Sequence, residues 1–118
     1  MAKLLVIDPR VAQSSYIALD HIKHNDELVL AFEDHARAHL GEPVDIATVA
    51  RAIGTSRRTL ERRVAVALGL SPVALVQRLR VERAAYLLRT TDQSSEQIAS
   101  QVGYADASTL RTLMRRLG

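Results

Sequence analysis

One pattern of residues occurs twice in the C-terminal two thirds of this 118-residue chain. The first copy is IATVARAIGTSRRTLERRVAVALG, residues 46–69, and the second is EQIASQVGYADASTLRTLMRRLG, residues 96–118. Each copy has an Ala four residues before a Gly, with a β-branched residue on either side of that Ala. Each then has a short polar turn and an Arg-bearing segment that opens at a Leu. A repeat of this kind indicates one small structural unit built twice.

The spacing within each copy is typical of a helix-turn-helix, in which two short helices cross steeply. The first helix needs a small residue where the second passes close. The turn favours a Gly with positive φ, and the second helix needs a side-chain oxygen as its cap. The residues that meet these needs are Ala50, Gly54 and Ser56 in the first copy, and Ala99, Gly103 and either Asp106 or Ser108 in the second.

The composition favours an all-α fold. Hydrophobic residues make up 47% of the chain but aromatic residues only 3%, and five Gly and three Pro leave few residues for the turns of an all-β fold. There is no Cys, which excludes disulfides, thiolate nucleophiles and Cys-based zinc sites. The apolar run LLVI is too short for a signal peptide or a membrane span. We therefore expect a soluble cytoplasmic chain with no membrane partner.

Four segments are expected along the chain. Residues 1–24 are irregular and form a linker or the tail of a missing N-terminal domain. Residues 25–70 form one additional helix followed by the first helix-turn-helix subdomain, and residues 71–90 form a long linker helix. Residues 91–118 form the second helix-turn-helix subdomain, whose end is either naturally divergent or truncated. The predicted fold is thus two helix-turn-helix subdomains joined by a long linker helix.

Local signals place the helix ends within these segments. The additional helix is capped by Asn25 or Asp26 and ends at Gly41. The linker helix begins at Ser71-Pro72, because Pro suits the first helical position. Ser95 is the expected N-cap of the first helix of the second unit. The linker helix should make apolar contacts on more than one side through Val76, Leu79, Val81, Ala84, Leu87 and Leu88.

Charge is distributed unevenly along the chain. Residues 1–40 carry four Lys or Arg against six Asp or Glu, whereas residues 41–118 carry twelve against seven. All twelve cations of the second segment are Arg, whose planar guanidinium pairs bidentately with phosphate or guanine. Codon bias in a GC-rich genome would also explain the excess of Arg. The segregation of charge nevertheless predicts an anionic partner for residues 41–118.

Residues 45–118 resemble the C-terminal DNA-binding domain of the AraC/XylS family of bacterial transcription regulators. Three motifs carry the resemblance: IATVARAIGTSRRTLERRV, LGLSPVALVQRLRVERAAYLL and SSEQIASQVGYADASTL. The middle motif is the most specific. The residues of this motif that fall where the family pattern has them are Gly69, Ser71-Pro72, Leu79-Arg80, Glu82-Arg83-Ala84 and Leu87-Leu88. The resemblance implies sequence-specific binding to double-stranded DNA and regulation of transcription, and we expect RNA polymerase as a further partner.

Other parts of the sequence refine this resemblance. Asp8-Pro9-Arg10 and the helix around Glu33-Asp34 resemble the approach to this domain in members with an amidotransferase-like N-terminal half. The effector-binding N-terminal domain would then be absent from this chain. The second recognition helix departs from the family, because Leu110 and Met114 stand where aromatic residues are usual. The tail expected after Gly118 is also missing.

The first recognition helix supplies long side chains for base contact. The N-terminal turns of such a helix face the major groove, which indicates Arg57, Arg58, Glu61 and Arg62. The family's base-reading positions fall on the last three of these. Arg can donate to guanine O6 and N7, and Glu61 can accept from the amino group of cytosine. Alternatively, Glu61 forms an ion pair within the helix with Arg58 or Arg57.

The second recognition helix offers shorter side chains. Its predicted base contacts are Ala107, Ser108, Thr109, Arg111 and Thr112, which suit thymine methyl contacts and phosphate hydrogen bonds. We therefore expect the first unit to supply most of the specificity and the second mainly affinity. The predicted phosphate contacts of both units are Thr55, Ser56, Arg63, Ser71, Arg115 and Arg116.

Two other classes of function remain as alternatives. His35 and His39 are spaced like a metal-binding pair on a helix, with His21 and His24 nearby, but no third ligand is evident. Surface histidines are the simpler interpretation, so we expect no enzyme, no cofactor and no metal. The other alternative is a helix-turn-helix module that binds a protein and has lost DNA binding. Salt dependence of DNA binding separates this alternative from a DNA reader.

Overall fold

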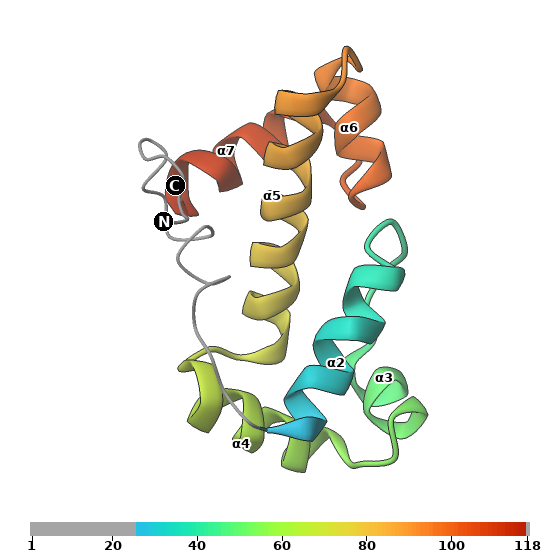
Figure 1. Ribbon diagram of the computed structural model, residues 1–118, viewed down its shortest axis with the longest axis vertical. Helices are drawn as coiled ribbons and strands as arrows, with labels where there is room; N and C mark the ends of the chain where they lie inside the picture. Colours follow the sequence, from blue (N-terminus) through green and yellow to red (C-terminus); the bar gives the residue numbers. More distant parts are fainter. Residues whose placement is uncertain (1–25, 118) are drawn as a thin grey trace.

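The computed structural model describes residues 26–117, which form six α-helices and no strand (Figure 1). The predicted all-α class is therefore confirmed for these residues. The predictions made for residues 1–24, for Asn25, and for Gly118 lie outside the described residues. The helices are α2 (Glu27–Ala38), α3 (Ile46–Ala52), α4 (Arg57–Leu68), α5 (Pro72–Thr90), α6 (Ser95–Gln101) and α7 (Ala107–Leu117).

The first lobe consists of α2, α3, α4 and the first half of α5. Phe32 of α2, Leu60 and Val64 of α4, and Leu75 of α5 are fully buried in one core. α2 contacts α3, α4 and α5, so the helix that precedes the first repeat is part of this lobe. The predicted inward orientation of Leu60 and Val64 is confirmed.

The second lobe consists of α6, α7 and the second half of α5. Its core contains Ala84 of α5, Ile98 and Ala99 of α6, and Leu110 of α7. The linker helix thus contributes to both cores, as predicted from its apolar residues. Leu88 is an exception, because its side chain is 45% exposed.

The two helix-turn-helix turns have the same backbone geometry. Gly54 has a φ of 86° and Gly103 a φ of 92°, which are left-handed conformations that favour glycine. The residue after each Gly donates its backbone N–H to the carbonyl of the crossing Ala, at 2.8 Å in both turns. Ala50 and Ala99 are fully buried at these crossings. The turns predicted from the repeat are therefore confirmed.

Capping residues fix the helix starts, with one correction to the sequence prediction. Asp26, Ser56 and Ser71 cap α2, α4 and α5 as predicted. Of the two candidates for α7, Asp106 accepts from the backbone N–H of Thr109 at 2.9 Å. The N-cap of α6 is Ser94 rather than Ser95, since Ser94 and Gln97 form a reciprocal capping box.

The prediction that Gly41 ends α2 also needs correction. The helix ends at Ala38, with His39 as its C-cap, so Gly41 lies beyond the cap. The described glycines with positive φ do not include Gly41.

No single helix among residues 26–117 is long and apolar enough to cross a membrane. α4 and α5 reach that length and composition only as a pair bent by 59°. Their apolar side chains contribute to the core of the first lobe.

Candidate nucleic-acid interface

The first candidate recognition helix, α4, is exposed along the side that carries its charged residues. Arg57, Arg58, Glu61 and Arg62 are all exposed. Ser56 starts the helix by accepting from the backbone N–H of Thr59, which places these side chains in the first two turns. This side of α4 is therefore available to a groove of DNA.

One ion pair within α4 lies on this exposed side of the helix. The Nε atom of Arg57 lies 3.0 Å from a carboxylate oxygen of Glu61, so the pair forms with Arg57 rather than Arg58. Both side chains are about half exposed, and exposed pairs of this kind contribute little to stability. Arg58 and Arg62 form no ion pair with any residue from 26 to 117. These two guanidinium groups are thus the ones most available to bind.

The second candidate recognition helix, α7, exposes all but one of its predicted contacts. Ser108, Thr109, Arg111 and Thr112 are exposed, and the Ser108 hydroxyl donates to Asp106 at 2.7 Å. Ala107 is fully buried in the second core, so its methyl group cannot reach a base edge. The prediction for Ala107 is corrected accordingly. Its spacing of three residues from Leu110 places it on the apolar side of the helix.

A second correction concerns Arg63, a predicted phosphate contact. Its guanidinium donates to both carboxylate oxygens of Asp26, at 2.6 and 3.0 Å. Asp26 is the N-cap of α2, so this bidentate pair joins α2 to α4 across 37 positions of sequence. Arg63 therefore has a structural role in the first lobe.

Replacement of Asp26 by Asn should reduce the loss of stability in acid. Hydrogen bonds from Arg63 hold the pKa of the Asp26 carboxyl below its ordinary value of 3.8, although burial opposes the shift. A lowered pKa in the folded state means that this contribution is present above the ordinary pKa. It is lost as the pH falls through the folded value. Urea unfolding at pH values from about 6 to about 3 should therefore show a flatter profile for the variant.

Asn is a good N-cap residue, so this substitution removes the ion pair and retains the cap. Asp34→Asn is the matched control, since Asp34 is exposed on the same helix. Equal acid dependence in wild type and Asp26→Asn would contradict the assigned role of the pair.

The remaining phosphate candidates lie near the N-terminus of a helix or at the end of α7. Ser56 and Ser71 are exposed N-cap residues of α4 and α5, and helix N-termini favour anions. Thr55 is half-buried at the turn before α4, while Arg115 and Arg116 are exposed in the last turn of α7. These positions are compatible with the predicted contacts.

The sequence did not single out Gln77, which lies beside α7. A groove of about 320 Å³ is lined by Gln77 of α5 together with Ser108, Thr109, Thr112 and Arg116. The sequence around Gln77 does not indicate that this side chain lies at the interface, because only the packing of α7 against α5 brings the two together. We add Gln77 to the candidate interface.

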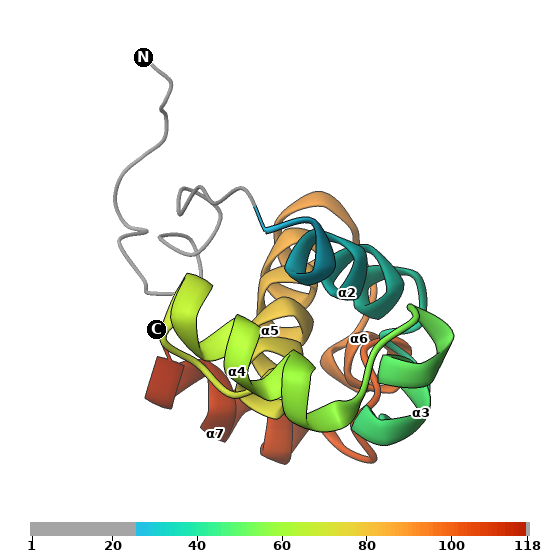
Figure 2. The same ribbon diagram turned by 90° about the horizontal axis from the view of Figure 1, so that it is seen from below.

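α5 determines how the two recognition helices are presented. α4 lies near one end of α5 and α7 lies farther along it (Figure 1). In both views α4 and α7 run in about the same direction, away from the side that holds α3 and α6 (Figure 2). The described structure measures 39 × 35 × 21 Å along its three principal axes.

Within residues 26–117, His35 of α2 and the C-cap residue His39 belong to no cluster that could hold a metal ion. The rings of His35 and His39 stack with centroids 4.4 Å apart, and His39 Nδ1 lies 2.8 Å from the His35 carbonyl oxygen. Among residues 26–117, no group of three or more His, Cys, Asp or Glu residues could hold a metal ion. His21 and His24, which are near this pair in the sequence, lie outside the described residues.

Comparison with known proteins gives a family match for residues 49–117, to a helix-turn-helix domain. The HTH-type transcriptional activator RhaS of Enterobacter sp. (strain 638) is 35% identical over 98 residues. That alignment covers 83% of this chain and 35% of the relative, so the chain spans about a third of that protein. RhaS of Escherichia fergusonii is 36% identical over 91 residues, covering 77% of this chain and 31% of the relative. These relatives are transcription regulators, which agrees with the prediction that the chain is not an enzyme.

Solved structures that resemble this chain also belong to transcription regulators. A transcriptional regulator with an AraC-type DNA-binding domain from Chromobacterium violaceum aligns with a TM-score of 0.72 at 29% identity, covering 75% of this chain and 80% of that chain. The DNA-binding domain of the global transcriptional factor AdpA, solved in complex with a target DNA, aligns with a TM-score of 0.68 at 34% identity. That alignment covers 78% of this chain and 82% of the AdpA chain.

Proposed function

Because the chain belongs to the AraC-type family of helix-turn-helix DNA-binding domains, we propose that α4 and α7 read successive major-groove segments of one operator. The observation that carries this proposal is the exposure of polar and Arg-rich surfaces on two recognition helices attached to a single linker helix. A single chain could then bind a direct-repeat site without dimerising.

The two helices would contribute unequally to DNA recognition. Arg58 and Arg62 are exposed on α4 and would donate to guanine, while Glu61 would accept from cytosine after release from Arg57. On α7, Arg111 is the only long side chain among the proposed base readers. We therefore assign most of the specificity to α4 and mainly affinity to α7. The proposed phosphate contacts are Thr55, Ser56, Ser71, Arg115 and Arg116.

The relatives support a proposal for the wider role of the protein. RhaS is a transcriptional activator, and this chain spans about a third of it. We propose regulation of transcription in the bacterial cytoplasm, with RNA polymerase as a partner and an effector-binding domain N-terminal to the described helices. An amidotransferase-like N-terminal half remains a prediction from residues 8–10 and the α2 segment.

Salt titration of DNA binding tests the proposal. The operator is first selected from fragments of the source genome, and its affinity is then measured by fluorescence anisotropy. If four or more phosphates are neutralised, raising the salt from about 50 to about 200 mM should lower the affinity by about 100-fold or more. The reason is that each Arg that pairs with a phosphate releases condensed counterions.

A random duplex of the same length is the control, and it should bind more weakly at every salt concentration. Failure to retain any genomic fragment, even at low salt, would instead indicate a helix-turn-helix module that binds a protein.

A further inference from the structure

The two lobes touch each other directly, in addition to sharing α5. The contact lies between the loop that follows α2 and the turn between α6 and α7. A Cβ atom on Gly103 would lie 2.6 Å from the carbonyl oxygen of Leu40, and one on Gly41 would lie 2.9 Å from that of Gln101. Both neighbours are backbone atoms of the opposite lobe. Only glycine at these two positions allows the backbones to approach so closely.

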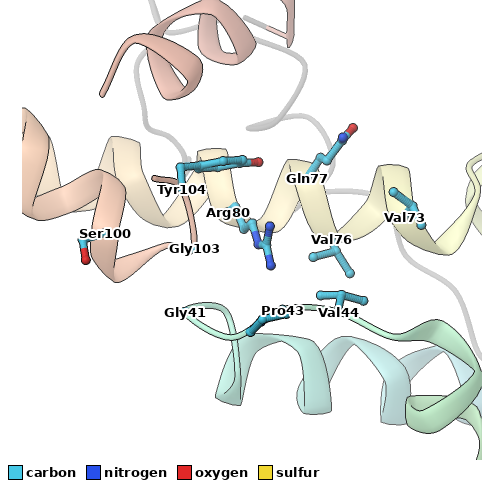
Figure 3. A pocket seen from close by; sticks show the side chains of 10 residues that line it. All are labelled: Gly41, Pro43, Val44, Val73, Val76, Gln77, Arg80, Ser100, Gly103 and Tyr104. Atoms are coloured by element: carbon cyan, nitrogen blue, oxygen red, sulfur yellow. The ribbon is translucent and has the colours of Figure 1, made fainter. Parts of the chain in front are cut away.

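The side chain of Arg80, on α5, lies next to this contact between the lobes (Figure 3). Its guanidinium donates to the carbonyl oxygen of Glu42 at 2.9 Å and lies over the Tyr104 ring, 5.4 Å from the centroid. Glu42 belongs to the loop of the first lobe and Tyr104 to the turn of the second. One side chain therefore binds both lobes.

Tyr104 is partly enclosed in this contact. Burial raises the pKa of its hydroxyl above 10.0, although the nearby Arg80 acts in the opposite direction. Beside the contact, the lobes are separated by a cleft of about 500 Å³ that includes Val44, Val73 and Val76 in its lining (Figure 3). Side chains do not fill this space, and beside it the lobes meet at the contacts of Arg80, Gly41 and Gly103.

The equivalent turn of the first lobe makes no such contact. Gly54 has nearly the same φ as Gly103, yet a Cβ atom there would meet nothing within 4 Å. Gly103 therefore serves both the turn and the contact between lobes, whereas Gly54 serves the turn alone.

We propose that Arg80, Gly41 and Gly103 form an interlobe clamp that fixes the separation of α4 and α7, and thereby the spacing of the two half-sites that the protein accepts. This inference rests on the proposed DNA-binding function. Arg80 acts as a positioning residue, because its contacts are to the two lobes.

A distance measurement on the free protein tests the clamp independently of DNA. The chain contains no Cys, so Val66→Cys on α4 and Glu96→Cys on α6 accept spin labels at these two sites alone. Both positions are exposed, and Val66 is 82% exposed. Double electron–electron resonance should give a narrow distance distribution. Arg80→Met and Gly41→Ala should broaden or shift it, since each disrupts one side of the clamp.

Two matched controls keep this test specific. Arg83 is also on α5 and lies over Tyr86 with its guanidinium carbon 5.2 Å from the ring centroid, but both residues belong to the same helix. Arg83→Met should therefore leave the distribution unchanged. Gly54→Ala introduces the same backbone strain as Gly103→Ala without the interlobe clash, so only Gly103→Ala should change the distance. Circular dichroism establishes that each variant is folded.

Selection from a duplex library with varied half-site spacing gives the second readout. The wild type should discriminate by about tenfold or more against a spacing changed by one base pair, and Arg80→Met and Gly41→Ala by less than about threefold. Unchanged distances and unchanged spacing preference in these two variants would overturn the clamp. If no variant and no wild type selects DNA, the proposed function fails, and the distance measurement alone decides the clamp.

Discussion

Replacement of Phe32 by Ala is expected to lower the free energy of unfolding by about 3–5 kcal/mol, the usual range for a Phe removed from a core. Phe32 is fully buried between helices of the first lobe. Small domains have about 5–15 kcal/mol of stability in total, so this loss is large. Urea denaturation followed by circular dichroism measures it. A protein with two lobes should be checked for a separate transition of the first lobe.

Leu30→Ala is the control for this prediction, because Leu30 lies on the same helix but is 43% exposed. Its cost should be below about 1 kcal/mol. The comparison bears on domain organisation, since α2 precedes the family match that begins at residue 49. Equal costs for Phe32→Ala and Leu30→Ala would mean that α2 is not an integral part of the first lobe.

Replacement of Arg58 by Ala should weaken binding to the selected operator by about 1–3 kcal/mol, which is about 5- to 150-fold, and relax its specificity. Arg58 is exposed on α4 and has no ion pair within residues 26–117, so its guanidinium is available to a guanine. Binding to random duplex should fall much less. The ratio of the two affinities, measured at one salt concentration, gives the result.

Two further variants complete this prediction. Arg89→Ala removes an exposed charge at the end of α5, outside the proposed interface, and should leave the ratio unchanged. Arg111→Ala should lower operator affinity with a smaller change in the ratio. If Arg58→Ala and Arg111→Ala weaken operator and random duplex equally, neither residue reads bases directly.

The sequence predicted the helices and turns well, because the interactions that form them are local. Crossing residues, turn glycines and caps act within a few positions of one another, so Ala50, Gly54 and Ser56 could be assigned from spacing alone. The error at Ser95 was also local. A capping box pairs Ser94 with Gln97 three residues later, a signal that was present in the sequence.

Two errors, at Ala107 and Leu88, came from side-chain orientation. Ala107 was included because it starts the recognition helix, although it shares the apolar side of α7 with Leu110 and Leu113. Leu88 was taken as buried from its hydrophobicity, but burial depends on which side of α5 the lobes cover. Propensity and composition cannot determine that coverage.

What the sequence by itself determined is therefore the pair of helix-turn-helix units, the helix that joins them, and the Arg-rich surface of α4. Each depends on contacts between near neighbours in the chain. The tertiary structure alone decided that Arg63 binds Asp26, that Gly103 contacts the other lobe while Gly54 does not, and that Arg80 bridges the lobes. These contacts join residues far apart in sequence, and only the packing of the helices against one another brings those residues together.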